Sequence, residues 1–386
     1  MNEQKPRLID SLKVWLSKPK NKALFIIGIL VLSLTIIVGL ISYKRYFKAE
    51  TQTPTDQETA DSIKNVSQEE KPKLDPSVVD GTMVEPEIAN RRPLAVMVEN
   101  HPQARPQAGL INASQVWEAI VEGGITRFMA VFSSQDAEKI GPVRSARPYF
   151  VNWASGYHAL YVHAGGSQAG LAAISSSNNI VDLPHTNGYF HREPQPGIAS
   201  EHTLFTSTAD LYDFASKKEV SLEADFETYQ FSDEAQLEQR PAEASIAIDF
   251  SSPSYKVDWT YDRDLNTYKR NLAGEPHVDR VTGDQIAVKN VITVTVNRRY
   301  DPNTNHGKGE WFMDTEGEGS ALIFQNGQVT KATWKKPTKG SSLKLFDENN
   351  QEIKLVRGKS WFEVVPPDIS VIHEEIAVLK TPTTTQ

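Results

Sequence analysis

Residues 122–167 read EGGITRFMAVFSSQDAEKIGPVRSARPYFVNWASGYHALYVHAGGS, and this stretch decides the fold. Two apolar runs in it, Phe128–Phe132 and Ala159–Val162, have the length of strands and end at polar or glycine-rich turns. A short helix is expected to open at Pro148, between the runs, and a second helix after Ser167. The alternation of strands and helices predicts an α/β layered domain with at least partly parallel strands.

The same stretch concentrates groups that attract anions. Guanidinium groups and the unpaired N–H groups at the start of a helix both favour negative charge. Loops after parallel strands meet at one edge of a sheet, so we expect these groups to share a cleft. The alternative is that the arginines pair with the domain's own carboxylates and the glycines only form turns. The predicted ligand-binding residues are Arg127, Arg144, Arg147, His163, Gly165, Gly166 and Ser167.

The N-terminal 85 residues divide into three segments. Residues 23–43 form an uncharged apolar run long enough to cross a bilayer as a helix. No small-residue cleavage site follows, so an uncleaved anchor is predicted. Six basic residues precede the span and three follow it, which predicts that residues 1–22 are cytoplasmic and the body is extracytoplasmic. Residues 44–85 are polar and dotted with proline, which predicts a disordered linker.

The remaining chain is predicted to hold two folded domains of different class. Residues 86–221 form the α/β domain, with a strand at Leu94–Val98 and helices at Ser114–Glu122 and near Ser207–Ser216. Residues 222–244 are an acidic joint. Residues 245–380 show short strand patterns separated by turn signals, which predicts a mostly antiparallel all-β domain. We expect proteolysis at the joint to release two stable fragments.

Composition excludes several classes of function. The chain has 386 residues and no cysteine, which rules out disulfides, thiolate metal sites, a catalytic cysteine and a lipid-modified N-terminal cysteine. The net charge is −8, but residues 1–50 carry +6, so the rest of the chain carries −14. An acidic body argues against general binding of nucleic acid, which requires a basic face.

Three further motifs have a chemical interpretation and a simpler one. Ser167 in Gly165–Ala169 could be the exposed serine of a nucleophile elbow, with its base among His158, His163, His185 and His202, or a plain helix N-cap. A metal could bind His185, His191 and His202 with Asp182 or Glu201, although the spacing is not a standard one. Residues 301–307 resemble a calcium loop with a displaced glycine, and a polar hairpin loop is the simpler interpretation. The sequence predicts no metal and no cofactor.

The motifs also resemble a known family. RPLAVMVENHPQARPQAGL, EGGITRF, IGPVRSARPYF and HAGGS are similar to the YerB-like family of bacterial envelope proteins, as are YDRDLNTYKR, HVDRVTGDQIAVKNV, GEGSALIFQNGQVTKATWKK and WFEVVP. The resemblance covers roughly residues 86–368 and implies a two-part domain of unknown function. Many members resemble lipoproteins, whereas this chain lacks the cysteine and relies on its apolar span. At Ser200–Thr206 the family has a Pro-His-Asn triplet, of which only His202 is present.

These observations predict a membrane-anchored envelope protein that binds an anionic wall or lipid-carrier ligand, or a partner protein. A fainter similarity to the LytR-CpsA-Psr transferases implies an alternative, a glycopolymer transferase acting on a pyrophosphate-linked carrier. Arg127, Arg144 and Arg147 would then contact the pyrophosphate, but VRSAR lacks the acidic residue that follows arginine in that family. A serine hydrolase using Ser167 is the remaining alternative.

Overall fold

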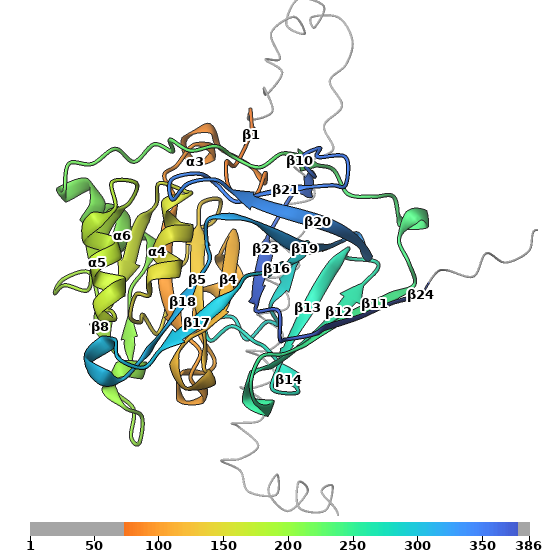
Figure 1. Cartoon of the computed structure of the whole chain (residues 1–386). Coiled ribbons are helices and arrows are strands. Elements are labelled where there is room, and N and C mark those ends of the chain that lie inside the picture. Colours follow the sequence, from red (N-terminus) through yellow and green to blue (C-terminus); the bar gives the residue numbers. More distant parts are fainter. Residues whose placement is uncertain (1–72, 377–386) are drawn as a thin grey trace, which may run out of the picture. The chain divides into compact units, whose positions relative to one another are not determined.

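The computed structural model describes residues 73–376, in which two large β-sheets and four helices are arranged as Figure 1 shows. The helices are α3 (Pro86–Ala89), α4 (Pro148–Ser155), α5 (Gln168–Ser176) and α6 (Thr208–Lys217). The predicted cytoplasmic segment 1–22 and membrane span 23–43 lie outside the described residues. Within residues 73–376, no helix is long and apolar enough to cross a membrane.

The larger sheet contains both strands of the stretch that decides the fold. Its order is β21 (Lys344–Phe346), β20 (Gln328–Lys336), β19 (Gly317–Gln325), β16 (Asn290–Thr295), β23 (Ser360–Val365), β4 (Gln115–Ile120), β5 (Thr126–Phe132), β3 (Leu94–Glu99), β6 (Leu160–His163) and β7 (Val181–Pro184). β3 pairs antiparallel with β5 and parallel with β6. The class is therefore mixed α/β with much sheet and few helices, which confirms the coarse prediction.

One predicted helix is a strand. Residues 115–120, expected to be helical, form β4, which pairs antiparallel with β5 and parallel with β23. Every residue of β4 is buried, so both of its faces pack in the core. The helical pattern of Val116 and Ile120 was misleading, because pairing with two neighbours outweighs the weak local preference of six residues.

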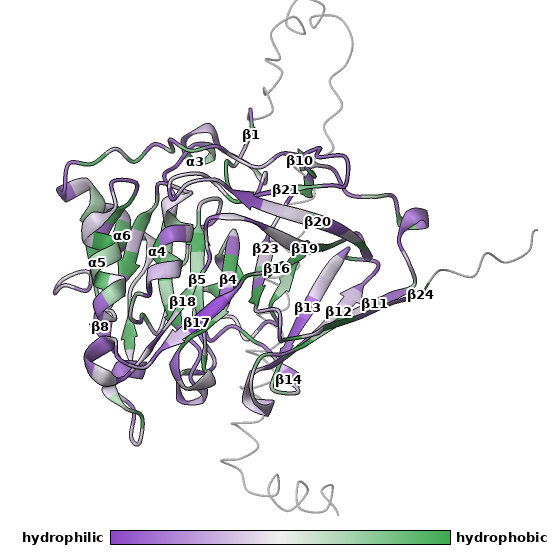
Figure 2. Cartoon of the chain, in the orientation of Figure 1, coloured by the Kyte–Doolittle hydropathy of each residue, from purple (hydrophilic) through white to green (hydrophobic). Residues whose placement is uncertain are grey.

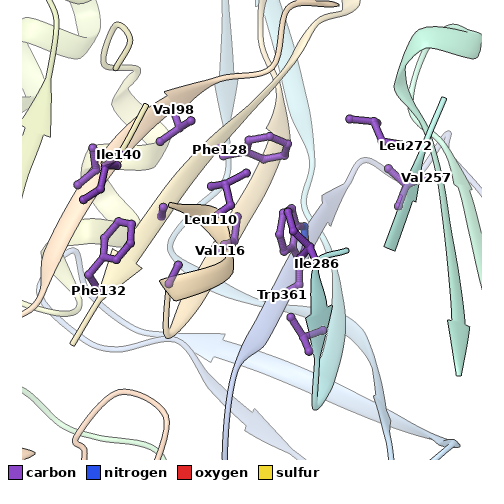
Figure 3. Packing of buried hydrophobic residues seen from close by; sticks show 14 of the residues in the cluster. Val98, Leu110, Val116, Phe128, Phe132, Ile140, Val257, Leu272, Ile286 and Trp361 are labelled. Carbon is purple, nitrogen blue, oxygen red and sulfur yellow. The ribbon is translucent and has the colours of Figure 1, made fainter. Parts of the chain in front are cut away.

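Alternate residues of the central strands pack into two separate cores. Leu94, Val96 and Val98 of β3 join the cluster that includes α6 and the second sheet, and Figure 3 shows part of this cluster. Ala95 and Met97 point to the opposite face, where they pack with α4 and α5. Strands buried on both faces are apolar throughout, and Figure 2 shows the central strands mostly green. Three layers result, with the large sheet in the middle.

The second sheet is antiparallel, as the sequence predicts. It does not form a separate domain, because it packs against the large sheet in a common core. Its order is β14 (Glu275–Pro276), β13 (Thr267–Leu272), β12 (Lys256–Asp262), β11 (Glu243–Asp249) and β24 (Val371–Ile376), with β15 (Ala287–Val288) also on β13. Five other strands from the predicted all-β domain lie in the large sheet with β4, namely β16, β19, β20, β21 and β23. The two halves therefore share one sheet and both cores, which argues against independent folding.

Both predicted connecting segments are partly folded. Residues 73–85 of the expected linker contain β1 (Asp75–Pro76) and β2 (Met83–Val84) and bury Val79 completely. In the expected joint, β10 (Phe231–Ser232) pairs with β22 (Leu355–Val356). Apolar residues in these polar segments find partners far away in sequence, which composition does not reveal. The other strand pairs are β8 (His191–Arg192) with β9 (Leu204–Phe205), and β17 (Arg298–Asp301) with β18 (Glu310–Met313).

Candidate functional site

The arginine loop and the glycine turn lie side by side at one end of the large sheet. The Ala146 N–H donates to the Gly165 carbonyl at 2.9 Å, and the Ala164 N–H donates to the Arg144 carbonyl at 2.9 Å. The predicted reason was wrong, because β5 is antiparallel to β3 and is not a neighbour of β6. The segment after β5 instead runs back past β3, where Val98 and Val143 form a bridge.

Arg127 belongs to this group because β5 is antiparallel. The start of β5 lies beside the end of β3, and Arg127 is directly opposite Glu99 in the register. An Arg127 Nη2 atom lies 3.5 Å from Glu99 Oε2, and Arg144 Nε donates to the same oxygen at 2.5 Å. The other oxygen of Glu99 accepts the N–H groups of Asn100 and His101. Glu99, at the end of a buried strand, therefore organises the site.

The charges of this group balance only when an exposed carboxylate is counted with them. Burial by itself raises the pKa of Glu99, but the nearby charges of Arg127 and Arg144 outweigh burial and lower it to about 2. Two guanidinium groups thus share one ionised carboxylate. The second carboxylate near Arg144 is that of Glu201, 3.6 Å away with half of its side chain exposed. The side chain of Arg144 is 24% exposed, so solvent reaches it.

Two histidines complete the group, which we call the Glu99 cluster: Glu99, His101, Arg127, Arg144 and His202. The rings of His101 and His202 stack with 4.7 Å between centroids. Nδ1 of His202 and Nε of Arg127 are buried without a hydrogen-bond partner. Burial lowers the pKa of His202, and the neighbouring His101 and Arg144 act in the same direction. Sequence reasoning missed Glu99 and His101, although the acidic end of LAVMVEN was a visible signal.

Arg147 pairs with a carboxylate of its own domain, which was the alternative to ligand binding for all three arginines. Its Nε and Nη2 atoms donate to the two carboxylate oxygens of Glu122 at 2.7 and 2.5 Å. Its Nη1 atom donates to the carbonyl of Ala146 at 2.7 Å. A bidentate ion pair of this kind satisfies the fork of the guanidinium group. Arg147 is therefore part of the support for the loop and not of the Glu99 cluster.

The glycine turn and Ser167 lie at the start of α5, where the carboxylate of Glu310 contacts Ser167. Gly165 has a φ of 69°, a left-handed conformation that glycine adopts without strain. Ser167 Oγ accepts the N–H of Gly170 at 3.0 Å, so the serine is the N-cap of α5. The hydroxyl of Ser167 donates to Glu310 of β18. These contacts match the simpler interpretation of Ser167 and leave the nucleophile elbow without a histidine base among its hydrogen bonds.

The histidines predicted as metal ligands are dispersed. His185 packs edge-on against the ring of Phe190, with 5.3 Å between centroids. His163, which was predicted as a ligand-binding residue, contacts the Gly165 carbonyl at 2.7 Å and Asp182 at 2.9 Å. His191 contacts Glu193 at 3.4 Å, whereas His202 stacks on His101. Over residues 73–376, no three histidine or acidic side chains form a group that could hold a metal ion. Residues 301–307 connect β17 to β18, as the hairpin interpretation expects.

Two family models, one for each half, match the described chain. Residues 80–221 match the family model described as "Protein of unknown function (DUF3048) N-terminal domain", and residues 246–362 match the model of its C-terminal domain. The chain belongs to this YerB-like family, as the sequence motifs predicted.

Two comparisons identify particular relatives. The chain is 32% identical over 292 residues to the Bacillus subtilis (strain 168) protein named "Putative lipoprotein YerB", covering 74% of this chain and 85% of that protein. The crystal structure of YerB protein from Bacillus subtilis has a TM-score of 0.66 and 30% identity, and covers 78% of this chain and all of the other. These similarities extend over both halves of the described chain.

Proposed function

We propose that this protein is a membrane-anchored, extracytoplasmic protein of the cell envelope that binds an anionic group at the Glu99 cluster. The observation that carries the proposal is the excess of charge. Arg127 and Arg144 share one ionised carboxylate, and neither arginine loses its proton at physiological pH. An anion at Arg144 would take the place of the exposed Glu201 carboxylate, which within residues 73–376 is the one other negative charge paired with these two arginines.

The contacts of Arg144 support a ligand on its open side. Its Nε atom donates to Glu99, while its Nη2 atom lies 3.6 Å from an oxygen of the exposed Glu201. An exposed ion pair at that distance contributes little to stability, so an incoming phosphate can replace Glu201 at low cost. The unpartnered Nδ1 of His202 offers a further polar contact. A phosphate-bearing wall or lipid-carrier ligand, or an acidic partner protein, has the required chemistry.

The location rests on two observations of different kind. The apolar, uncharged residues 23–43 have the length of a membrane span, and the basic residues before it favour an extracytoplasmic body. The relative is named as a lipoprotein, and a lipid anchor would hold it at a membrane surface. In this chain, which has no cysteine, the apolar span replaces that anchor.

Titration of the full-length protein with inorganic pyrophosphate tests the anion site. Binding is followed by the rise in melting temperature, since a ligand that binds the folded state stabilises it by mass action. The Arg144→Ala variant should bind at least about tenfold more weakly, which corresponds to the loss of one charge-assisted contact of about 1.4 kcal/mol.

A matched control uses an arginine outside the cluster. Arg299 is 68% exposed on β17, and its nearest acid is Asp301 at 3.6 Å. The Arg299→Ala variant should bind pyrophosphate like the wild type. Equal binding by Arg144→Ala and the wild type would refute the proposal. Equal weakening in both variants would show that pyrophosphate responds to general surface charge only.

A further inference from the structure

The β17–β18 ribbon lies over the face of the large sheet that α4 and α5 cover, where Trp311 and Met313 of β18 pack against the core. Its two strands pair with each other and belong to neither large sheet. In Figure 1 the ribbon extends from the C-terminal half across α4 towards α5, and the turn at its tip (Asn305–Gly307) contacts α5. A two-stranded ribbon is only marginally stable in isolation, so its position depends on what it touches.

Glu310 is the polar contact that fixes the ribbon at the start of α5. Its Oε1 atom accepts the hydroxyl hydrogen of Ser167, the N-cap of this nine-residue helix. The backbone N–H of Ala169 also favours the ionised form of Glu310. The N-terminus of a helix attracts anions because its first N–H groups lack partners within the helix. The carboxylate of Glu310 therefore occupies the position that an anionic ligand would take.

The fit of Glu310 to this position is incomplete. The residue has no exposed surface, yet its Oε2 atom has no hydrogen-bond partner. A buried carboxylate oxygen without a partner costs free energy. Burial raises the pKa of Glu310, although the hydroxyl of Ser167 and the charge of Arg147 oppose this.

The turn of the ribbon is strained as well. Asn305 and His306 have φ values of 50° and 55°, a left-handed conformation that costs a residue with a side chain roughly 1 kcal/mol or more. The start of α5 is thus occupied by Glu310, one of whose buried carboxylate oxygens has no hydrogen-bond partner. The turn of the ribbon that carries Glu310 has left-handed residues. Displacement of Glu310 would give its unpaired oxygen access to water.

We propose that the start of α5, with Ser167 and the amide of Ala169, is a second binding site that takes a carboxylate-bearing ligand and that Glu310 of the β17–β18 ribbon occupies in the free protein. The ligand class follows from the resident group, which is itself a carboxylate in contact with Ser167. When an external carboxylate binds, Glu310 leaves and the ribbon moves away from α5. This site is separate from the Glu99 cluster and goes beyond the anion binding proposed above.

Amide hydrogen exchange on the full-length protein, with and without acetate, tests the proposal. In the wild type, acetate should speed exchange in residues 298–313, because it displaces Glu310 and frees the ribbon. In Glu310→Ala, no carboxylate occupies the start of α5, and acetate should bind there and slow amide exchange at Ala169 and Gly170. At about ten times its dissociation constant, acetate should slow that exchange about tenfold. Acetate is thus expected to speed exchange in the wild-type ribbon and to slow exchange at the start of α5 in Glu310→Ala.

Controls separate this site from general effects. Chloride at the same ionic strength should reproduce neither change. The Glu318→Ala variant removes an acid whose side chain is 68% exposed, and it should behave like the wild type. If Glu310→Ala does not fold, Glu310→Gln keeps the shape of the side chain, and its ribbon should exchange faster than that of the wild type without acetate.

The results that overturn the proposal are specific. Acetate that leaves the wild-type ribbon unchanged, or that slows exchange everywhere alike, contradicts a displaceable Glu310. Repeating the measurement in Arg144→Ala distinguishes the two sites. The response at α5 should persist there even though pyrophosphate binding is weakened, and its loss would mean that the Glu99 cluster accounts for both effects.

Discussion

Two groups of buried arginines and glutamates have opposite stoichiometry. In the Glu99 cluster, two arginines share one glutamate near the surface. In the core, one arginine, Arg270 of β13, is placed with two glutamates, Glu118 and Glu363, and has no exposed surface. Arg270 donates to Glu118 at 2.5 Å, its Nη1 atom lies 2.6 Å from Nδ1 of His277, and its guanidinium group lies 4.6 Å from the ring of Trp361. We call these residues the Arg270 network.

The core can neutralise its excess charge, whereas the surface cluster cannot. Burial, and then the neighbouring Glu118, raise the pKa of Glu363 well above its usual value, which favours its protonated, uncharged form beside Glu118. Burial also lowers the pKa of His277 well below its usual value, which keeps this ring neutral. An arginine excess has no such remedy, because guanidinium groups stay charged. The difference indicates that the core network is structural, and it supports the proposal that the Glu99 cluster binds an anion.

The largest expected effect is the loss of Arg270. The Arg270→Ala variant leaves Glu118 buried without its cation, and breaking a buried pair in this way costs about 3–5 kcal/mol of the free energy of unfolding. Urea unfolding of the full-length protein measures it. The control, Arg357→Ala, removes an exposed pair with Asp233 and should cost less than about 1 kcal/mol. A similar small loss in both variants would remove the distinction between core and surface.

The next effect concerns acid stability of the surface cluster. The pKa of Glu99 is about 2 in the folded protein, against an ordinary value of 4.5. Its contribution to stability is therefore present above pH 4.5 and is lost as the pH falls towards 2. Over that window the wild type should lose roughly 3 kcal/mol more than Glu99→Gln. Urea unfolding at several pH values measures both, and parallel curves would contradict the ion pairing.

A smaller effect is expected at Arg144. Its side chain is partly exposed, and Arg127 remains as a partner for Glu99 when it is removed. We expect Arg144→Ala to lower the free energy of unfolding by about 1 kcal/mol or less, although pyrophosphate binding is weakened. A loss as large as that of Arg270→Ala, with binding unchanged, would make Arg144 a structural residue too.

No separation is expected when the chain is cleaved between the halves. The shared sheet pairs β4 with β23, and the Arg270 network joins β13 to β4 across the same boundary. After limited proteolysis within residues 222–244, the two fragments should elute together in size-exclusion chromatography. This reverses the expectation from the sequence pattern. Separate, folded fragments would show that the interface contributes less than the contacts suggest.

Much of the local structure could be predicted from the sequence. β3, β5 and β6 were recognisable as short apolar runs, and Ser167 as an N-cap, because these signals depend on neighbouring residues. β4 was mistaken for a helix, since its state depends on β5 and β23. The ligand-binding hypothesis named Arg127 and Arg144 but not Glu99, because the pairing of β3 with β5 brings that glutamate to them.

The sequence by itself determined the family, the strand-and-helix alternation of residues 122–167 and the apolar, uncharged character of residues 23–43, because each is a property of contiguous residues. Only the tertiary structure decided how each charge is used. Arg147 has Glu122 as a bidentate partner, Arg270 is sealed beside Trp361, and Arg144 keeps an open side. The physical reason is that partner and solvent exposure, which set the free energy of a charged group, come from residues distant in sequence.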